Sequence, residues 1–136
     1  MKRSATSVWK GGGKDGTGHL TTKSLTLNKT QYSFSSRFEN GTGTNPEELV
    51  AAAHAGCFNM KLSFVLGNVG FVPDELNTSC EITIEDGKII SSKLFLTAKI
   101  KGIDKTVFEN AVKDAELSCP ISLLLDTIIT VEYSLQ

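Results

Sequence analysis

The side chains best suited to chemistry in this sequence are its three cysteines, Cys57, Cys80 and Cys119. A thiolate is a strong nucleophile that oxidises reversibly, but a cysteine becomes reactive only where its surroundings lower its pKa. The number is odd and no spacing fits a zinc or disulfide framework, so we expect free thiols in a reducing compartment. Their local surroundings then decide which of them is a catalytic candidate.

Cys119 directly precedes Pro120, a residue that suits the first position of a helix. Its sulfur would then lie at a helix N-terminus, where unpaired amides and the helix dipole favour a thiolate. An unreactive capping cysteine fits the same pattern. Cys80 falls on the apolar face of an alternating segment, where a free cysteine usually serves as a small hydrophobic residue.

Cys57 lies among small apolar residues, and His54 precedes it by three positions on the same helical face. This spacing allows a Cys–His nucleophile pair or half of a metal site. A packed core cysteine and a histidine that fills the surroundings of the helix fit equally. His19 is the only other histidine, which weighs against a zinc site.

A reactive cysteine also needs a positively charged neighbour, and Arg37 is the candidate because it sits among the apolar and small residues of 34–38 rather than in a run of charges. A partly buried arginine requires a carboxylate partner. The nearest in sequence are Glu39, Glu47 and Glu48. An exposed arginine on a short strand fits the same residues.

The elements that must position these side chains are readable from the pattern. Residues 4–9, 19–27 and 31–38 are expected strands, and the glycines of 11–18 are expected to close a hairpin. Asn45 is a good N-cap before Pro46, which predicts a helix over 46–67. That helix is apolar almost all round, so we expect it to be central, buried on most faces and wrapped by sheet.

The second half alternates over 76–84, and Asp86-Gly87 predicts a tight hairpin into a strand over 88–101. Asp104 caps a predicted helix, Pro120 starts a short one, and a last strand covers 127–135. The apolar stripe of the Asp104-capped helix is Val107, Phe108, Ala111, Val112 and Ala115. These elements predict one α+β domain over residues 1–136.

Composition excludes little and favours a soluble protein. The formal net charge of −1 gives no argument for nucleic acid or a charged membrane surface as a partner. The first residues contain no apolar stretch of signal-peptide length. The apolar region 49–66 is interrupted by polar residues, which argues against a membrane span: His54, Asn59, Lys61 and Ser63. We expect a cytoplasmic protein.

Taken together, the motifs around the cysteines closely resemble the OsmC/Ohr superfamily, and specifically its OsmC branch. The resemblance covers nearly the whole chain, including the opening strand and glycine-rich turn. The segments that carry it are Arg37-Phe38-Glu39, Gly43 to Leu49, Ala52 to Phe58, Gly70-Phe71-x-Pro73 and Cys119-Pro120-Ile121-Ser122.

The resemblance implies a two-cysteine peroxidase that reduces organic hydroperoxides. By motif, Cys57 would be the peroxidatic nucleophile, Cys119 the resolving thiol, and Arg37 with Glu47 the activating pair. The implied fold is an OsmC-like α+β fold with an antiparallel sheet wrapped around a long buried central helix, in an intertwined homodimer. The implied reductant is an external dithiol, such as a dihydrolipoyl group, and no metal or other cofactor is implied.

One geometric expectation follows from the helix itself. Glu47 and Cys57 are ten residues apart on the predicted helix, which places them about 15 Å apart along its axis. One guanidinium cannot easily contact both. We therefore expect the Arg37–Glu47 pair that serves each Cys57 to come from the other subunit.

Three other functions stay open at the level of sequence. A regulatory protein with a slow Cys57–Cys119 disulfide switch would show no sustained turnover with a dithiol. A zinc hydrolase built on His54 and Cys57 would lose activity to a chelator. A purely structural dimer would tolerate serine at both cysteines.

Overall fold

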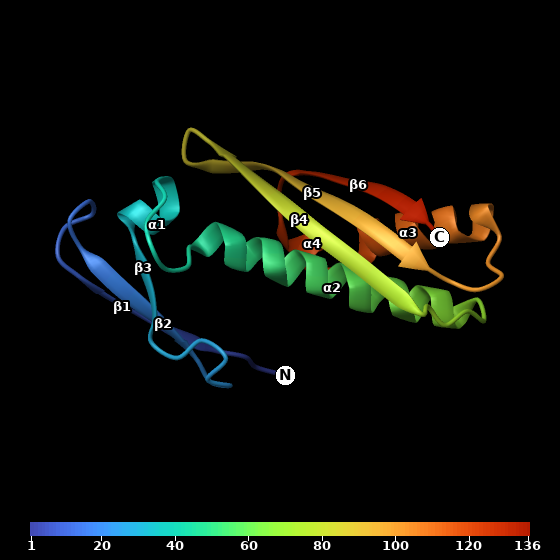
Figure 1. Ribbon diagram of the computed structural model, residues 1–136, viewed down its shortest axis with the longest axis horizontal. Coiled ribbons are helices and arrows are strands. Elements are labelled where there is room, and N and C mark those ends of the chain that lie inside the picture. The colour runs from blue at the N-terminus through green and yellow to red at the C-terminus, as the bar shows by residue number, and fades with distance from the viewer. The chain divides into compact units, whose positions relative to one another are not determined.

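The computed structural model describes all residues, Met1–Gln136, and each of its two units, Met1–Leu49 and Val50–Gln136, contains one three-stranded sheet (Figure 1). The long helix α2, Pro46–Asn68, begins in the first unit and lies mostly in the second. That the whole chain behaves as one domain stays a prediction.

The first unit is an antiparallel sheet of β1 (Ala5–Lys10), β2 (Thr17–Thr22) and β3 (Thr30–Ser33), in that order. The glycine-rich segment closes the β1–β2 hairpin as predicted, and Gly11 adopts a φ of 94° that favours glycine. The predicted second strand was too long. It ends at Thr22 because the backbone N–H of Thr22 bonds the Leu27 carbonyl at 2.9 Å and closes a turn.

The prediction of strand over 31–38 was wrong in its second half. Phe34–Phe38 form a short helix, α1. Ser33 caps it: its hydroxyl accepts from the Ser36 N–H, and the Ser36 hydroxyl accepts from the Ser33 N–H. This reciprocal cap stabilises a helical turn that the aromatic residues alone would not predict.

Helix α2 begins where predicted, and the Asn45 side chain accepts from the Glu48 N–H at 2.8 Å. Its buried residues recur at one face: His54, Phe58, Leu62 and Leu66. The expectation of burial on most faces is not met within the chain, since Met60 and Phe64 are 66% and 67% exposed. The sheet of the second unit covers one side of this helix.

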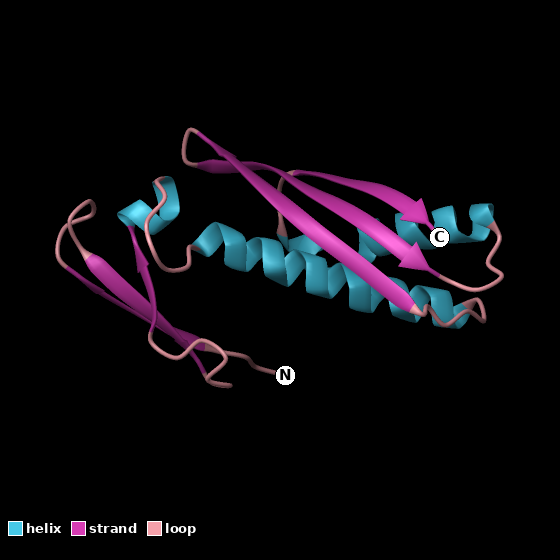
Figure 2. Ribbon diagram, viewed as in Figure 1, coloured by secondary structure: helices cyan, strands magenta, loops and turns pink.

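The second unit pairs β4 (Glu75–Glu85) with β5 (Lys88–Lys99) through the predicted Asp86-Gly87 hairpin. Helices α3 (Lys105–Ser118) and α4 (Pro120–Leu124) then lead to β6 (Ile128–Leu135), which pairs with β5 in parallel. The implied antiparallel sheet is therefore mixed, because the α3–α4 crossover returns the chain in the direction of β5. Figure 2 shows these strands as one layer beside the helices.

The core of the second unit forms where α2 and α3 meet the inner face of β5. It includes Phe58 and Leu62 of α2, Leu94 and Leu96 of β5, and Phe108 of α3. The α3 stripe matches the prediction, and Asp104 caps α3 through its side chain.

By length and composition alone, α2 is the one helix apolar enough to cross a membrane, with a mean hydropathy of 1.4. Two of the polar residues that interrupt it have partners inside the protein. His54 bonds Ser92 of β5, and Asn59 bonds Thr78 of β4.

Candidate active site

The fold brings together two cysteines that are 62 positions apart in sequence. Cys57 on α2 packs against the buried cluster that contains Cys119, which lies between α3 and α4, and the Cys119 thiol is close enough to shift the pKa of Cys57. Cys119 is fully buried and Cys57 is partly exposed. Cys57 is therefore accessible to a reagent, and the buried Cys119 lies next to it. Reversible disulfide formation needs such an arrangement.

The surroundings of Cys57 within its unit do not by themselves activate it. Burial and the nearby Cys119 thiol raise the pKa of the Cys57 thiol above its ordinary value, whereas the Ile121 backbone lowers it. The net direction is upward. Thiolate formation at neutral pH therefore requires a positive charge, which neither Cys119 nor the Ile121 amide supplies.

The sequence-based expectation for the Cys119 sulfur needs correction. Cys119 does cap α4, but its side chain makes no capping hydrogen bond. The amide of this turn that reaches a thiol is that of Ile121, and the thiol is that of Cys57. The reason is that the Cys119 side chain is enclosed in the core between α3 and α4.

His54 does not pair with Cys57. Its imidazole is fully buried, with Nδ1 2.6 Å from the Ser92 hydroxyl and Nε2 2.9 Å from the Ser122 hydroxyl. Burial lowers its pKa, so the ring is neutral. With both nitrogens engaged, His54 is free neither to accept a proton from Cys57 nor to bind zinc, and the geometry does not favour the hydrolase alternative.

Cys80 behaves as its strand pattern predicted. It packs against the core of the second unit, and its sulfur lies 3.3 Å from the Ser92 hydroxyl. Burial raises its pKa. The hydrogen-bond partner of Cys80 is a serine, whereas Cys57 lies beside a second thiol, which leaves Cys57 and Cys119 as the candidates for redox chemistry.

The predicted partnership of Arg37 and Glu47 is present in the first unit. Nε and Nη2 of Arg37 both donate to Oε1 of Glu47, at 2.8 and 2.5 Å. This hydrogen bonding raises the pKa of Arg37 further, so the guanidinium stays charged. The other oxygen, Oε2, is buried without a partner. Glu47 thus fixes one edge of the guanidinium, and Arg37, 41% exposed, keeps donors free.

An aromatic hollow of about 220 Å³ lies beside Arg37 within the first unit. Its lining combines the Arg37 side chain with apolar residues: Trp9, Tyr32, Phe34, Phe38 and Pro46. The guanidinium carbon lies 4.9 Å from the centre of the Phe38 ring. A hollow with one cation and aromatic walls suits a small ligand that has a polar end and an alkyl or aryl body.

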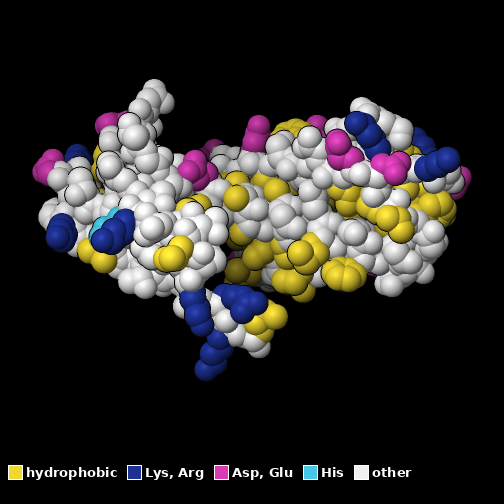
Figure 3. Space-filling view, turned by 60° about the horizontal axis from the view of Figure 1, so that its bottom comes forward, with side chains coloured by type: hydrophobic (Ala, Val, Ile, Leu, Met, Phe, Trp, Pro, Cys, Tyr) yellow, Lys and Arg dark blue, Asp and Glu magenta, His cyan; other side chains and the backbone are white.

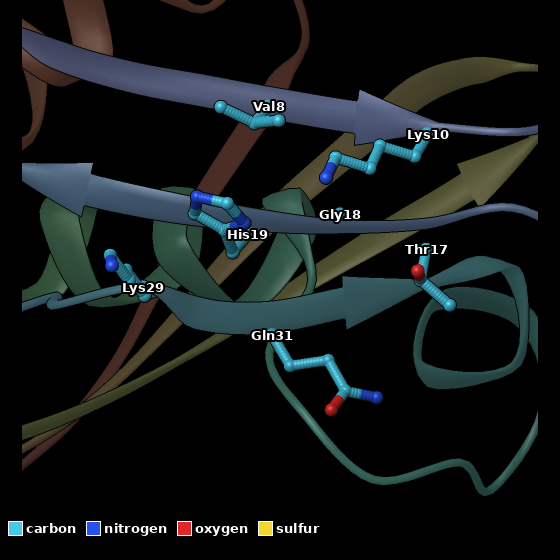
Figure 4. A pocket seen from close by; sticks show the side chains of 7 residues that line it. All are labelled: Val8, Lys10, Thr17, Gly18, His19, Lys29 and Gln31. Atoms are coloured by element: carbon cyan, nitrogen blue, oxygen red, sulfur yellow. The ribbon is translucent and has the colours of Figure 1, made fainter.

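A larger hollow of about 380 Å³ lies on the β1–β2–β3 sheet (Figure 4). Figure 4 shows Lys10, His19 and Lys29 around it, with Val8 and Thr17 nearby. It contains no thiol or other activated nucleophile. It therefore offers no chemistry comparable to that of the cysteine pair.

Sequence reasoning missed three residues of the site: Ser92, Ser122 and Ile121. Ser122 was within the Cys119-Pro120-Ile121-Ser122 motif, so its position was available as a signal. Ser92 lies on the buried face of β5, where the other fully buried residues are apolar. A buried serine on such a face indicates a polar partner. Nothing in the sequence marks the amide of Ile121.

Comparison with known proteins agrees with this geometry. Residues 39–134 match the family model described as OsmC-like protein. The peroxiredoxin OsmC of Escherichia coli strain K12 is 39% identical over 132 residues, which covers 94% of this chain and 92% of that protein.

Solved structures show the same fold. The organic hydroperoxide resistance protein OhrB of Bacillus subtilis superposes with a TM-score of 0.65 at 25% identity, covering 98% of both chains. An OsmC-like protein from Mycoplasma pneumoniae reaches a TM-score of 0.75 at 12% identity, covering 99% of this chain and 97% of that one. The family match, the extended identity and the shared fold establish that this chain belongs to the OsmC-like protein family.

Proposed function

We propose that this protein is a thiol-dependent peroxidase that reduces organic hydroperoxides to alcohols. The observation that carries the proposal is the contact of Cys57 with Cys119, one partly exposed and the other buried beneath it. The 39% identity to a peroxiredoxin over nearly the whole chain supports it. Two proteins of similar structure, from Bacillus subtilis and Elizabethkingia anophelis, are organic hydroperoxide resistance proteins.

The chemistry balances with these two thiols and a dithiol. The Cys57 thiolate attacks the distal peroxide oxygen, the O–O bond breaks, and the leaving alkoxide takes a proton to become the alcohol. Cys119 then attacks the sulfur of the Cys57 sulfenic acid, and the departing hydroxide leaves as water. An external dithiol, with a dihydrolipoyl group as the candidate, reduces the disulfide and is itself oxidised.

Arg37 would act on both charges of the first step. Its guanidinium would stabilise the thiolate and donate to the alkoxide that develops as the O–O bond breaks. Glu47 would hold the guanidinium by the edge that carries Nε and Nη2. The aromatic hollow around Arg37 would favour an alkyl or aryl hydroperoxide over hydrogen peroxide, because the latter buries no apolar surface.

We further propose that the active unit is a homodimer in which Arg37 and Glu47 of one subunit serve Cys57 of the other. The raised pKa of Cys57 within its own unit and the distance between Glu47 and Cys57 along α2 support this arrangement. So do the exposed Met60 and Phe64 of α2. Hydrophobic side chains gather in clusters on the surface that Figure 3 shows.

The test is the intact mass and free-thiol count before and after one equivalent of tert-butyl hydroperoxide, followed by turnover with dihydrolipoamide. The wild-type protein should lose two hydrogens and two thiols. Cys57→Ser should lose none, and Cys119→Ser should gain one oxygen as a trapped sulfenic acid. Cys80→Ser is the matched control and should behave as the wild type.

The same experiment separates the alternatives. A disulfide that forms without sustained turnover would replace the peroxidase with a redox sensor. Three thiols that persist through prolonged exposure would overturn both.

A further inference from the structure

A buried chain of hydrogen bonds crosses the second unit from sheet to active-site turn. It runs from Cys80 on β4 to Ser92 on β5, then through both ring nitrogens of His54 on α2 to Ser122 on α4. Ser92 and His54 are fully buried, and Ser122 is 8% exposed. No charged side chain bonds to any of the four.

A neutral imidazole has one donor nitrogen and one acceptor nitrogen, so it can satisfy two hydroxyls only in a directed chain. One such order has the Cys80 thiol donating to Ser92, Ser92 donating to Nδ1, and Nε2 donating to Ser122. Every group then has a partner in a core where an unpaired polar atom is costly. This series of hydrogen bonds, from Cys80 to Ser122, therefore connects the sheet to α4, and we call it the strut.

Helix α4 is short and depends on contacts with the rest of the unit for its position. It has five residues, too few for a helix to be stable alone, and Leu123 and Leu124 are 73% and 74% exposed. Its attachments to the core are the partly buried Ile121 and the bond from Ser122 to His54. Cys119 and the Ile121 amide, which both contact Cys57, flank or belong to this turn.

We propose that His54 is a positioning residue: through Ser122 it holds the Cys119–Ser122 turn in register with Cys57. This inference rests on the peroxidase function proposed above and concerns its second step. Disulfide formation requires the Cys119 sulfur to approach the Cys57 sulfenic acid in line, displacing hydroxide. A turn released from His54 reaches that geometry less often, and the exposed sulfenic acid then reacts with a second hydroperoxide.

The variant that tests this is Ser122→Ala, which removes the α4 end of the strut and no atom of either thiol. The variant leaves the buried Nε2–H of His54 without its Ser122 acceptor, which frees the turn. Rapid-quench mass spectrometry should then show disulfide formation slowed about tenfold. Sulfenic acid formation, followed as alcohol release in the first turnover, should change less than about threefold, because it depends chiefly on Arg37. Excess hydroperoxide should convert Cys57 to sulfinic acid with release of a second alcohol.

Two further variants make the result specific. Ser122→Thr keeps the hydroxyl and should restore the rate of disulfide formation. Thr78→Val removes another hydrogen bond between α2 and β4, that of Thr78 to Asn59 at 2.6 Å, and does not touch α4. It should leave the partition between disulfide and sulfinic acid unchanged. Ser92→Ala, at the sheet end of the strut, should act in the same direction as Ser122→Ala.

The outcomes separate this inference from the function beneath it. If the wild-type protein forms no disulfide with hydroperoxide, the peroxidase proposal fails. If it does and Ser122→Ala forms the disulfide at the wild-type rate, His54 does not position the turn. Equal slowing in Thr78→Val would also overturn the inference, because it would mean that general loosening of the α2–sheet contact is the cause.

Discussion

At the scale of single residues, the three cysteines differ through their neighbours rather than their type. Cys80 is partly buried against the core and bonded to Ser92, whereas Cys57 contacts a second thiol and the Ile121 amide. His54 lies three residues from Cys57, yet its nitrogens bond two serines from distant parts of the chain. Spacing along a helix therefore identified the site but not the roles of its members.

The buried neutral state of His54 predicts how stability depends on pH. Burial lowers the pKa of His54 in the folded protein, so near and below its ordinary pKa the unfolded chain binds a proton that the folded one does not. Stability is then lost as the pH falls through about 6.5 toward the folded pKa, by up to about 1.4 kcal/mol per pH unit. Urea unfolding between pH 7.5 and 5 measures this loss.

The control for this prediction is a comparison of the two histidines. His54→Gln should be less stable at pH 7.5 but should lose less free energy of unfolding on acidification than the wild type. His19→Gln removes the other histidine, on β2, and should keep the loss that His54 causes. An unchanged pH dependence in His54→Gln would mean that another group causes the destabilisation.

At the scale of elements, a side-chain cap begins the helix that leads to Cys119. Asp104 caps α3, and its side chain accepts from the Thr106 and Val107 amides at 2.8 and 3.3 Å. Asp104→Ala should lower the free energy of unfolding by about 1 kcal/mol, while Asp104→Ser, which restores a capping oxygen, should recover most of it. Chemical denaturation of the reduced protein gives both values. Equal stability of the alanine and wild-type proteins would show that α3 does not depend on this cap.

The elements that the sequence predicted well are those with local causes. Asn45 and Asp104 cap their helices by contacts within three residues, and Asp86-Gly87 closes its hairpin through left-handed φ values of 49° and 75°. The helix at Phe34–Phe38 was missed because its reciprocal serine cap was not recognised.

Contacts between residues far apart in the sequence could not be predicted from the residue pattern alone. Alternation along β6 does not say which way it pairs, and the contact of Cys57 with Cys119 depends on the α3–α4 crossover. The roles of Ser92 and Ser122 likewise appear only once three elements are packed around His54. The family resemblance indicated the cysteine pair, but the hydrogen bonds around it come from the fold.

At the scale of the whole molecule, the residues of the proposed mechanism belong to different units of the chain. Arg37 and Glu47 belong to Met1–Leu49, and both redox cysteines belong to Val50–Gln136. A dimer offers each Cys57 a guanidinium from its own chain or from the other chain. Both arrangements, Arg37 acting within its own chain or on the other chain, give the same activity in the wild-type protein. Only mixed dimers distinguish them.

Mixed dimers of Arg37→Met and Cys57→Ser chains provide that test. Each parent dimer lacks one essential group at both sites and should be inactive. If the pair acts between subunits, a mixed dimer has one complete site, so random mixing after refolding should restore about a quarter of wild-type activity. The control mixes Arg37→Met with an Arg37→Met, Cys57→Ser double variant and should stay inactive. Should the first mixture also stay inactive while mixed dimers are shown by mass, the guanidinium acts within its own chain, and the proposed exchange between subunits is wrong.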